Sequence, residues 1–196
     1  VFNEVVFTHL TVQPDQESRF TSPVVVYQSP VTFTQSEFSN IDAEDALNII
    51  RSDFLIQNVI FNDVASDAFD SDFSNGKITD TIFTNIGNDA IDVSGSNVEL
   101  SNVEMSQIGD KGFSVGEGSI ASVDRLTVDN AVIGVAVKDG STLKAESIEV
   151  YNSEVDVAVF KKKTEYGDAY AAIKNTNIRK YLLESGSRLI IDGKES

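Results

Sequence analysis

A constant spacing between small residues constrains the fold of this 196-residue chain more than any other feature. Each small residue lies in a similar local pattern, and the next one follows 22 residues later. The series is Ala46, Ala68, Ala90, Gly112 and Gly134. Repeats of this length are typical of solenoids, in which each repeat forms one coil that stacks on the next.

The repeats have the character of β-strands. Each contains short apolar segments rich in β-branched residues, separated by Ser, Gly, Asn or Asp, and few segments have a helical period. We therefore predict an all-β fold, a right-handed single-stranded parallel β-helix of about eight rungs with a 22-residue repeat. The same spacing predicts a corner column of Asn58, Asp80, Asn102, Asp124 and Glu146, followed by a column of Ile60, Ile82, Glu104, Leu126 and Ile148.

The sequence predicts one domain over residues 1–196. It divides into an irregular first rung (1–23, with a turn-rich loop at 13–18), regular rungs (24–160), an inserted loop (161–168) and terminal rungs (169–196). The step from Ile148 to Ile178 is 30 residues, which indicates eight extra residues in the insertion. The chain opens on Val1, which we interpret as a segment of a longer protein with flanking domains.

Composition narrows the classes of partner. The net charge is −16, from 31 acidic and 15 basic residues. This field repels nucleic acid and anionic membrane surfaces, so we expect neither as a partner. No apolar run is long enough for membrane insertion. The absence of cysteine excludes disulfides and thiolate metal sites.

Three aspartates form the main candidate site. Strand alternation turns Phe69 and Ser71 inward and Asp70 and Asp72 outward, and Asp92 lies one rung further on. Carboxylates this close repel, so either a pKa is raised or a cation lies between them. The trio has the chemistry for acid–base or nucleophilic attack on a glycosidic bond, or for binding Ca2+.

The surface around the aspartates has the composition of a sugar-binding groove. Asn48 extends the Asp70 column, and small residues, among them Ser94 and Ser114, give a shallow floor that ends at Lys138. Phe160 and Tyr166 lie at the far end, where an aromatic ring favours stacking on a sugar. A separate column of Asp45, Asp67, Asp89 and Lys111 predicts an ion pair between Asp89 and Lys111.

Several repeats carry recognisable motifs. They are Asn88-Asp89-Ala90-Ile91-Asp92, Gly109-Asp110-Lys111-Gly112, Ala136-Val137-Lys138-Asp139 and Lys162-Lys163-Thr164-Glu165-Tyr166-Gly167. With these motifs the chain, over roughly residues 24–191, resembles right-handed parallel β-helix repeat proteins of the pectin-lyase-like superfamily. The resemblance implies a large secreted or surface-attached microbial protein, in a superfamily that includes polysaccharide lyases, glycosidases and binding modules.

Three functional hypotheses remain open at this point. The first is a carbohydrate-contacting module of a secreted or cell-surface protein, which binds a polysaccharide or surface glycan through the aspartates. The second is a polysaccharide lyase or glycoside hydrolase that uses Asp70, Asp72 and Asp92 with Lys111 or Lys138. The third is a spacer or adhesin module without a ligand. The single long insertion favours the non-enzymatic readings.

Overall fold

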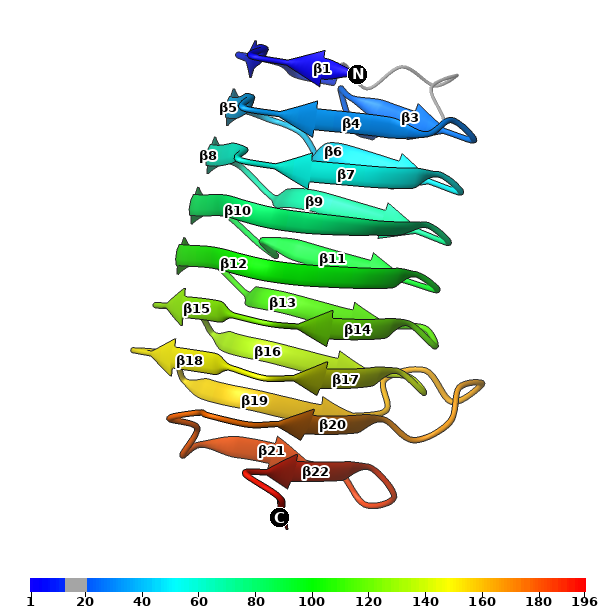
Figure 1. Ribbon diagram of the computed structural model, residues 1–196, viewed down its shortest axis with the longest axis vertical. Coiled ribbons are helices and arrows are strands. Elements are labelled where there is room, and N and C mark those ends of the chain that lie inside the picture. The colour runs from blue at the N-terminus through cyan, green and yellow to red at the C-terminus, as the bar shows by residue number, and fades with distance from the viewer. Residues whose placement is uncertain (13–20) are drawn as a thin grey trace.

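The computed structural model describes residues 1–12 and 21–196, and the turn-rich loop predicted at 13–18 lies outside them. The described residues form strands and no helix, so none contains a helix long and apolar enough to cross a membrane. The strands wind into stacked coils that run from the N-terminus at one end to the C-terminus at the other (Figure 1). The predicted all-β parallel solenoid, with about eight turns, is confirmed.

Two sheets make up the coils of the described chain. One has eight parallel strands, which we call the eight-stranded sheet. Its members, in spatial order, are β3 (Val25–Tyr27), β6 (Asp45–Ile50), β9 (Asp67–Asp72), β11 (Ile91–Ser94), β13 (Lys111–Gly116), β16 (Ile133–Lys138), β19 (Val155–Phe160) and β21 (Tyr181–Leu183).

The other sheet has fifteen strands and bends around a corner of the coil, because β10 and β12 each continue through that corner. Its main path is β1 (Phe2–Asn3), β4 (Val31–Thr34), β7 (Asp53–Gln57), β10 (Asn75–Ile86), β12 (Asn97–Ile108), β14 (Ile120–Val123), β17 (Thr142–Ala145), β20 (Tyr170–Ile173), β22 (Arg188–Ile191) and β23 (Lys194–Glu195). Beyond the corner lie β2 (Val6–Thr8), β5 (Glu37–Ile41), β8 (Ile60–Val64), β15 (Leu126–Asp129) and β18 (Ile148–Tyr151).

Polar residues in left-handed backbone conformation form the corners. The corner inside β10 has Asp80 at φ 50°, between Asn58 at φ 53° and Asn102 at φ 55° in the neighbouring coils. Asn and Asp tolerate this conformation better than other residues with a side chain. This explains why the repeat places Asn or Asp where the chain must turn the corner.

The 22-residue step holds in the middle of the chain but not throughout. Val25 pairs with Asn48, a step of 23 rather than 22 at the start of the rungs predicted to be regular. The step from β12 to β15 is also 23, because Val103 pairs with Leu126. The extra residue lies between β13 and β14, where the turn contains Gly118.

This shift corrects two predicted columns. Arg125 rather than Asp124 follows Asn102 at the corner, and Glu146 shifts with Asp124. Leu126 and Ile148 point inward and are fully buried. Ile60 and Ile82, which were predicted to share their column, are 44% and 42% exposed. One added residue thus exchanges the inward and outward faces of a strand.

The insertion adds fewer residues to the repeat than the sequence predicted. Thr142 pairs with Tyr170, a step of 28, which is one repeat plus six residues rather than eight. Ile148 correspondingly pairs with Thr176 and not with Ile178. The resulting loop between β19 and β20 is the longest described excursion from the coils (Figure 1).

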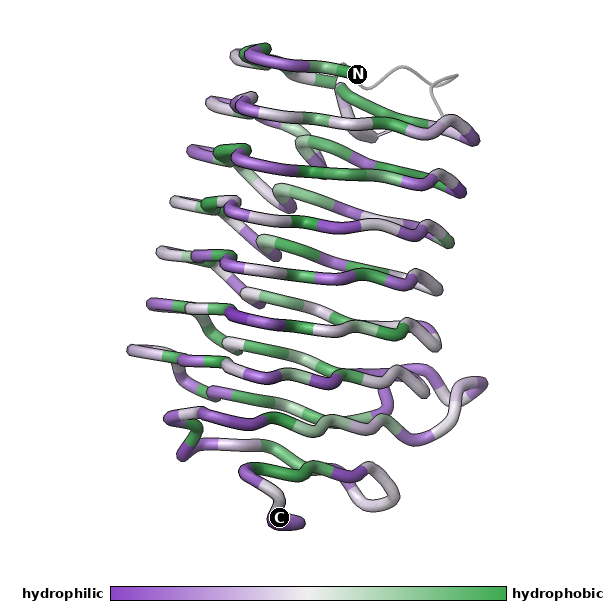
Figure 2. Tube along the Cα trace, in the orientation of Figure 1, coloured by the Kyte–Doolittle hydropathy of each residue, from purple (hydrophilic) through white to green (hydrophobic). Residues whose placement is uncertain are grey.

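The interior is apolar and ordered along the coil axis. Phenylalanine rings of successive coils stack in a row, with centroid distances of 4.6 Å from Phe7 to Phe38, 4.9 Å from Phe38 to Phe61 and 4.7 Å from Phe61 to Phe83. Hydrophobic positions recur in each coil along the trace (Figure 2). The inward residues predicted from alternation, including Phe69 and Ser71, are fully buried.

A ladder of buried serines joins the coils at the turn after the eight-stranded sheet. The backbone amide of each serine donates to the hydroxyl of the next, at 3.0 Å from Ser52 to Ser74, from Ser74 to Ser96 and from Ser96 to Ser119. Each hydroxyl also donates to a carbonyl, as Ser96 does to Ser94 at 3.0 Å. The ladder therefore satisfies polar groups that the turn would otherwise leave unpaired.

Candidate functional sites on the two outer faces

The predicted site residues on the eight-stranded sheet lie on one outer surface, which we call the aspartate face. Its first column has the ladder order Asn48, Asp70, Asp92, Ser114, and its second runs Asp72, Ser94, Gly116, Lys138, Phe160. Neighbours in a column lie about 4.8 Å apart, the spacing of paired strands. The parallel register therefore brings together residues that are 22 positions apart in the sequence.

The pKa of Asp70 lies far above the ordinary value for an aspartate. Burial raises the pKa of Asp70 to about 9, and repulsion from Asp72, Asp45, Asp92 and Asp67 adds to this effect. Asn48 Nδ2 donates to Asp70 Oδ2 at 3.2 Å. Asp70 is therefore a neutral acid at neutral pH, which is one of the two outcomes that the sequence left open for the trio, the other being a bound cation.

The pKa of Asp72 is also raised, first by burial, although Asn48 counteracts the shift by hydrogen bonding to the carboxylate. A neutral carboxylic acid two residues from a second carboxyl group is the pairing that acid–base chemistry requires. The arrangement is chemically suited to proton transfer, and it is equally the expected outcome of crowding acids on one face.

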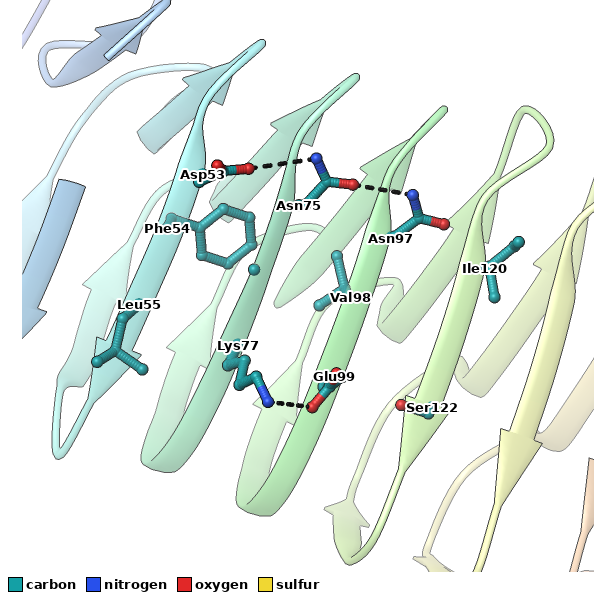
Figure 3. A pocket seen from close by; sticks show the side chains of 11 residues that line it. Asp53, Phe54, Leu55, Asn75, Lys77, Asn97, Val98, Glu99, Ile120 and Ser122 are labelled. Atoms are coloured by element: carbon teal, nitrogen blue, oxygen red, sulfur yellow. Dashed lines mark hydrogen bonds and ion pairs between the residues drawn. The ribbon is translucent and has the colours of Figure 1, made fainter. Parts of the chain in front are cut away.

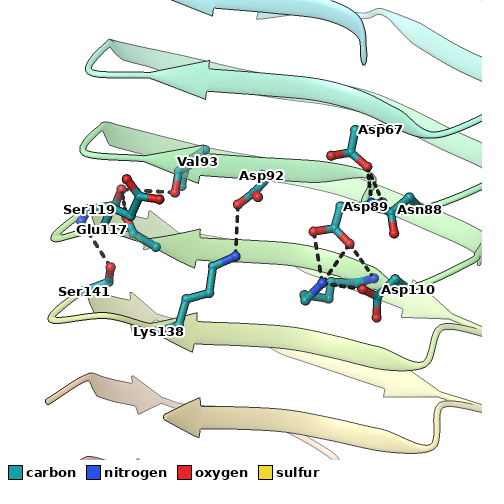
Figure 4. A network of polar contacts seen from close by, with 12 residues as sticks. Asp67, Asn88, Asp89, Asp92, Val93, Asp110, Glu117, Ser119, Lys138 and Ser141 are labelled. Atoms are coloured by element: carbon teal, nitrogen blue, oxygen red, sulfur yellow. Dashed lines mark hydrogen bonds and ion pairs between the residues drawn. The ribbon is translucent and has the colours of Figure 1, made fainter. Parts of the chain in front are cut away.

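Lys111 has a structural partner. Its Nζ lies 3.2 Å from Asp89 Oδ1, which confirms the ion pair predicted between adjacent coils. The Lys111 backbone amide donates to the same oxygen at 3.0 Å, and the Asp89 amide donates to Asp67 Oδ1 at 3.0 Å (Figure 4). Burial raises the pKa of Asp89 to about 6, although Lys111 opposes the shift. These contacts hold successive coils in register.

The predicted shallow floor is covered. Ser114 and Ala136 are fully buried, although both point outward. The Lys138 side chain lies across Gly116, where an added Cβ would be 2.7 Å from Lys138 Cε. It places Nζ 3.6 Å from Asp92 Oδ1 (Figure 4). Lys138 therefore fills the space that the small residues leave.

The aromatic residues predicted for the groove lie toward the insertion. Phe160 pairs with Lys138 in the ladder and is partly buried. Tyr166 belongs to the inserted loop, in which Lys163 forms an ion pair with Glu117. The loop is anchored further by Asp139 Oδ1, which accepts the backbone amides of residues 162 and 163 at 2.7 and 2.6 Å.

The aspartates do not form a metal site in this structure. Within residues 1–12 and 21–196, no group of three or more His, Cys, Asp or Glu side chains is arranged to hold a metal ion. Asp70, Asp72 and Asp92 are separated along and across the strands and are not gathered around one point. The geometry therefore gives no support to the calcium hypothesis.

A groove that the sequence did not predict lies on the outer face of the fifteen-stranded sheet. It has a volume of about 590 Å³ and runs across β7, β10, β12 and β14 (Figure 3). We call it the axial groove. It is lined by Asp53, Phe54, Leu55, Asn75, Gly76, Lys77, Asn97, Val98, Glu99, Ile120 and Ser122.

The axial groove has two edges of mostly polar outward side chains, and its floor is the strip of inward-pointing residues between them. On one edge Asn97 Nδ2 donates to Asn75 Oδ1 at 2.8 Å, and Asn75 Nδ2 donates to Asp53 Oδ1 at 3.3 Å. On the other edge Lys77 and Glu99 form an ion pair at 2.7 Å. The view along the face shows both rows running across the strands, with the floor between them (Figure 3).

The floor depends on a glycine at an inward position. A Cβ on Gly76 would lie 2.4 Å from the Phe54 ring, so the ring occupies the space that the missing side chain leaves. Phe54 and Val98 are 6% and 2% exposed, so their side chains belong to the core beneath the groove. The signal in the sequence was Gly76 between Phe54 and Val98 at the 22-residue step, together with Asn75 and Asn97 beside them.

The sequence matches the model of a known protein family. A family model described as a right-handed β-helix region matches residues 23–181, more than three quarters of the chain. The chain belongs to this family. Membership in the wider pectin-lyase-like superfamily is consistent with the match. No match was found among curated proteins or among solved structures.

Proposed function

We propose that this β-helix is a carbohydrate-binding module that holds a neutral polysaccharide chain in the axial groove. The observation that carries the proposal is the groove itself, about 590 Å³ in volume, with amide and charged side chains along its edges and the exposed Ile120 at one end. Ligand sites of this size are usually apolar with a few placed polar groups. Side-chain amides and carboxylates match sugar hydroxyls, and the outward apolar side chains of Leu55 and Ile120 match the C–H surfaces of sugar rings.

The direction of the groove favours a linear polymer. A second hollow of about 390 Å³ shares Asp53, Phe54 and Leu55 with the axial groove and extends toward β4 at Val31 and Thr32. Together they cross five strands, which is about 19 Å at the spacing of paired strands. Asp53, Asn75 and Asn97 repeat a polar group over three of these coils, so this edge offers similar contacts to successive sugar units.

The charge of the protein selects the kind of polysaccharide. With a net charge of −16, the chain repels polyanions over long range. The cation on the groove edge, Lys77, is already paired with Glu99. A neutral glycan therefore fits better than an acidic one. We propose that the module serves a larger secreted or surface protein that meets such glycans.

Affinity electrophoresis through neutral polysaccharides tests this function. The double variant Asn75→Ala/Asn97→Ala removes the amide edge and should lose at least tenfold in affinity. Asn62→Ala is the matched control, because Asn62 lies on β8, beyond the corner, and bonds to Asp63 at 2.8 Å. Equal retardation of the double variant and the control contradicts the proposal, and no retardation on any glycan supports a spacer role.

Asp70 favours glycoside hydrolysis at the aspartate face as a second candidate function. A carboxyl group with a pKa of about 9 remains protonated at neutral pH, as a general acid must. In this reading Asp70 protonates the leaving oxygen and Asp72 serves as base or nucleophile. Release of reducing ends from a glycan, abolished by Asp70→Asn, supports hydrolysis, and no release by the wild-type protein rejects it.

A further inference from the structure

Lys138 is a cation held on the aspartate face without a hydrogen bond to its partner. Its stem crosses Gly116, and its Nζ lies 3.6 Å from Asp92 Oδ1. This distance is within ion-pair range but longer than an N–H···O hydrogen bond. The Lys138 side chain is 9% exposed, so its charge is largely removed from water. Its attachment to Asp92 is therefore electrostatic.

Lys111, on the same face, is a lysine whose ammonium group is held by hydrogen bonds. Its Nζ donates to both oxygens of Asp89, at 3.2 and 3.3 Å, and also to Asp110. Three acceptors match the three donors of an ammonium group. Lys111 is thus part of the coil structure, whereas Lys138 lacks comparable bonds to Asp92.

Two buried oxygens on adjacent strands of the aspartate face have no hydrogen-bond partner among the described residues. They are Ser114 Oγ, on a fully buried residue, and Asp92 Oδ1. Asp92 and Ser114 are opposite each other on adjacent strands and both point to the outer side. Their Cα atoms are thus about 4.8 Å apart. Buried acceptors are normally satisfied, so this pair is prepared to accept N–H groups.

The surroundings favour a positive ligand. Asp70 is opposite Asp92 in the ladder, Asp72 is opposite Ser94, and Asp67 lies on the same strand as Asp70 and Asp72. The net charge of −16 gives the protein a negative field that concentrates cations. A small metal ion requires several oxygens around one point, which this face does not offer among the described residues. A primary ammonium group needs only acceptors at hydrogen-bond distance.

We propose that Asp92 and Ser114 form a binding site for the primary ammonium group of a small ligand, and that Lys138 occupies this site as an internal cation until the ligand replaces it. The shared chemistry is R–NH3+, which a linear amine or an amino sugar supplies. The site is on the opposite sheet from the axial groove and does not depend on polysaccharide binding there.

Calorimetric titration with two probes tests the proposal, namely 1,4-diaminobutane and the glucosamine disaccharide. Lys138→Met keeps an unbranched apolar stem over Gly116 and removes the competing charge. It should bind an amine probe at least tenfold more tightly than the wild-type protein. Adding Asp92→Asn or Ser114→Ala to this variant should remove the gain. Lys144→Met, an exposed lysine on β17, is the control for the change in net charge.

The probes separate the sources of the ammonium group. Tighter binding of the disaccharide assigns an amino sugar, and tighter binding of the diamine assigns a linear amine. The N-acetylated disaccharide should not bind, and equal binding of it overturns the proposal. So does equal affinity of the Lys138→Met and Lys144→Met variants.

A measurement on the wild-type protein remains decisive if Lys138→Met does not fold. With lysines labelled by 13C at Cε, saturating amine should shift the Lys138 resonance toward that of a solvated lysine. An unchanged Lys138 resonance under saturating amine overturns the proposal.

Discussion

Asp70 makes the stability of this protein depend on pH in an unusual direction. The folded pKa is about 9, caused first by burial and then by neighbouring aspartates, whereas an unfolded aspartate titrates near 3.9. Between these values the folded protein holds a proton that the unfolded chain has lost. The free energy of unfolding therefore falls as pH rises, and the contribution is lost as pH passes through the folded pKa.

The size of this change in the free energy of unfolding is set by the one proton that folded Asp70 holds. A single group contributes a slope of about 1.4 kcal/mol per pH unit, or about 2.7 kcal/mol between pH 6.5 and 8.5. Asp70 retains partial exposure, so solvent screening makes this an upper bound. The interval lies above the pKa of Asp89, which is about 6, so Asp89 adds little to the slope there.

The perturbation is Asp70→Asn, which keeps the size of the side chain and removes its titration. Urea unfolding followed by circular dichroism at pH 6.5, 7.5 and 8.5 measures the slope. The variant should gain stability relative to the wild-type protein as pH rises, by up to about 2.7 kcal/mol over the interval.

Asp124→Asn is the control, because Asp124 is exposed beside β14 and the substitution is the same exchange of a carboxyl group for an amide. It should keep the wild-type slope. Parallel pH profiles for Asp70→Asn and the wild-type protein would refute the reasoning, since they would mean that Asp70 is already ionised at neutral pH.

Three further predictions concern the coils. Phe61→Ala removes a fully buried ring from the phenylalanine row and should cost about 3–5 kcal/mol in the urea-derived free energy of unfolding; a loss below about 1 kcal/mol contradicts the stacked core. Ser96→Ala leaves the backbone amide of the preceding coil without its acceptor and should cost about 1–3 kcal/mol in the same measurement, and a neutral result argues against the ladder. Gly109→Ala places a Cβ 2.1 Å from the Gly87 carbonyl oxygen and should lower the melting temperature sharply. Gly167→Ala is the control, because the space around Gly167 is open, and it should melt like the wild-type protein. Equal melting temperatures of the two variants would contradict the close approach of the coils at Gly109.

The fold was predictable from the sequence because the coils repeat their chemistry in one register. The small residues at the 22-residue step, such as Ala68 and Ala90, are fully buried where successive coils pass closely. Inward and outward positions on β9 followed from alternation alone. The predicted 22-residue register is wrong at the turn that contains Gly118. A single added residue in this turn changes the step but leaves the local pattern of apolar residues unchanged.

The site was less predictable because it depends on side-chain paths between coils. The position of Lys138 follows from the absence of a side chain at Gly116, which the sequence shows only once the register is known. The axial groove likewise depends on Gly76 and on where the Phe54 ring lies. Strand alternation assigns such residues to a face but does not say which neighbour covers them, so the floor of Ser114 and Ala136 was predicted open and is covered.

The most direct test of the proposed function is an amide chemical-shift titration of the labelled protein with a neutral linear oligosaccharide that it retains in electrophoresis. The account predicts shifts concentrated on β7, β10, β12 and β14, with the largest near Asn75, Lys77 and Asn97. Shifts confined to the aspartate face, around Asp70 and Asp92, would contradict it and return the carbohydrate site to the eight-stranded sheet.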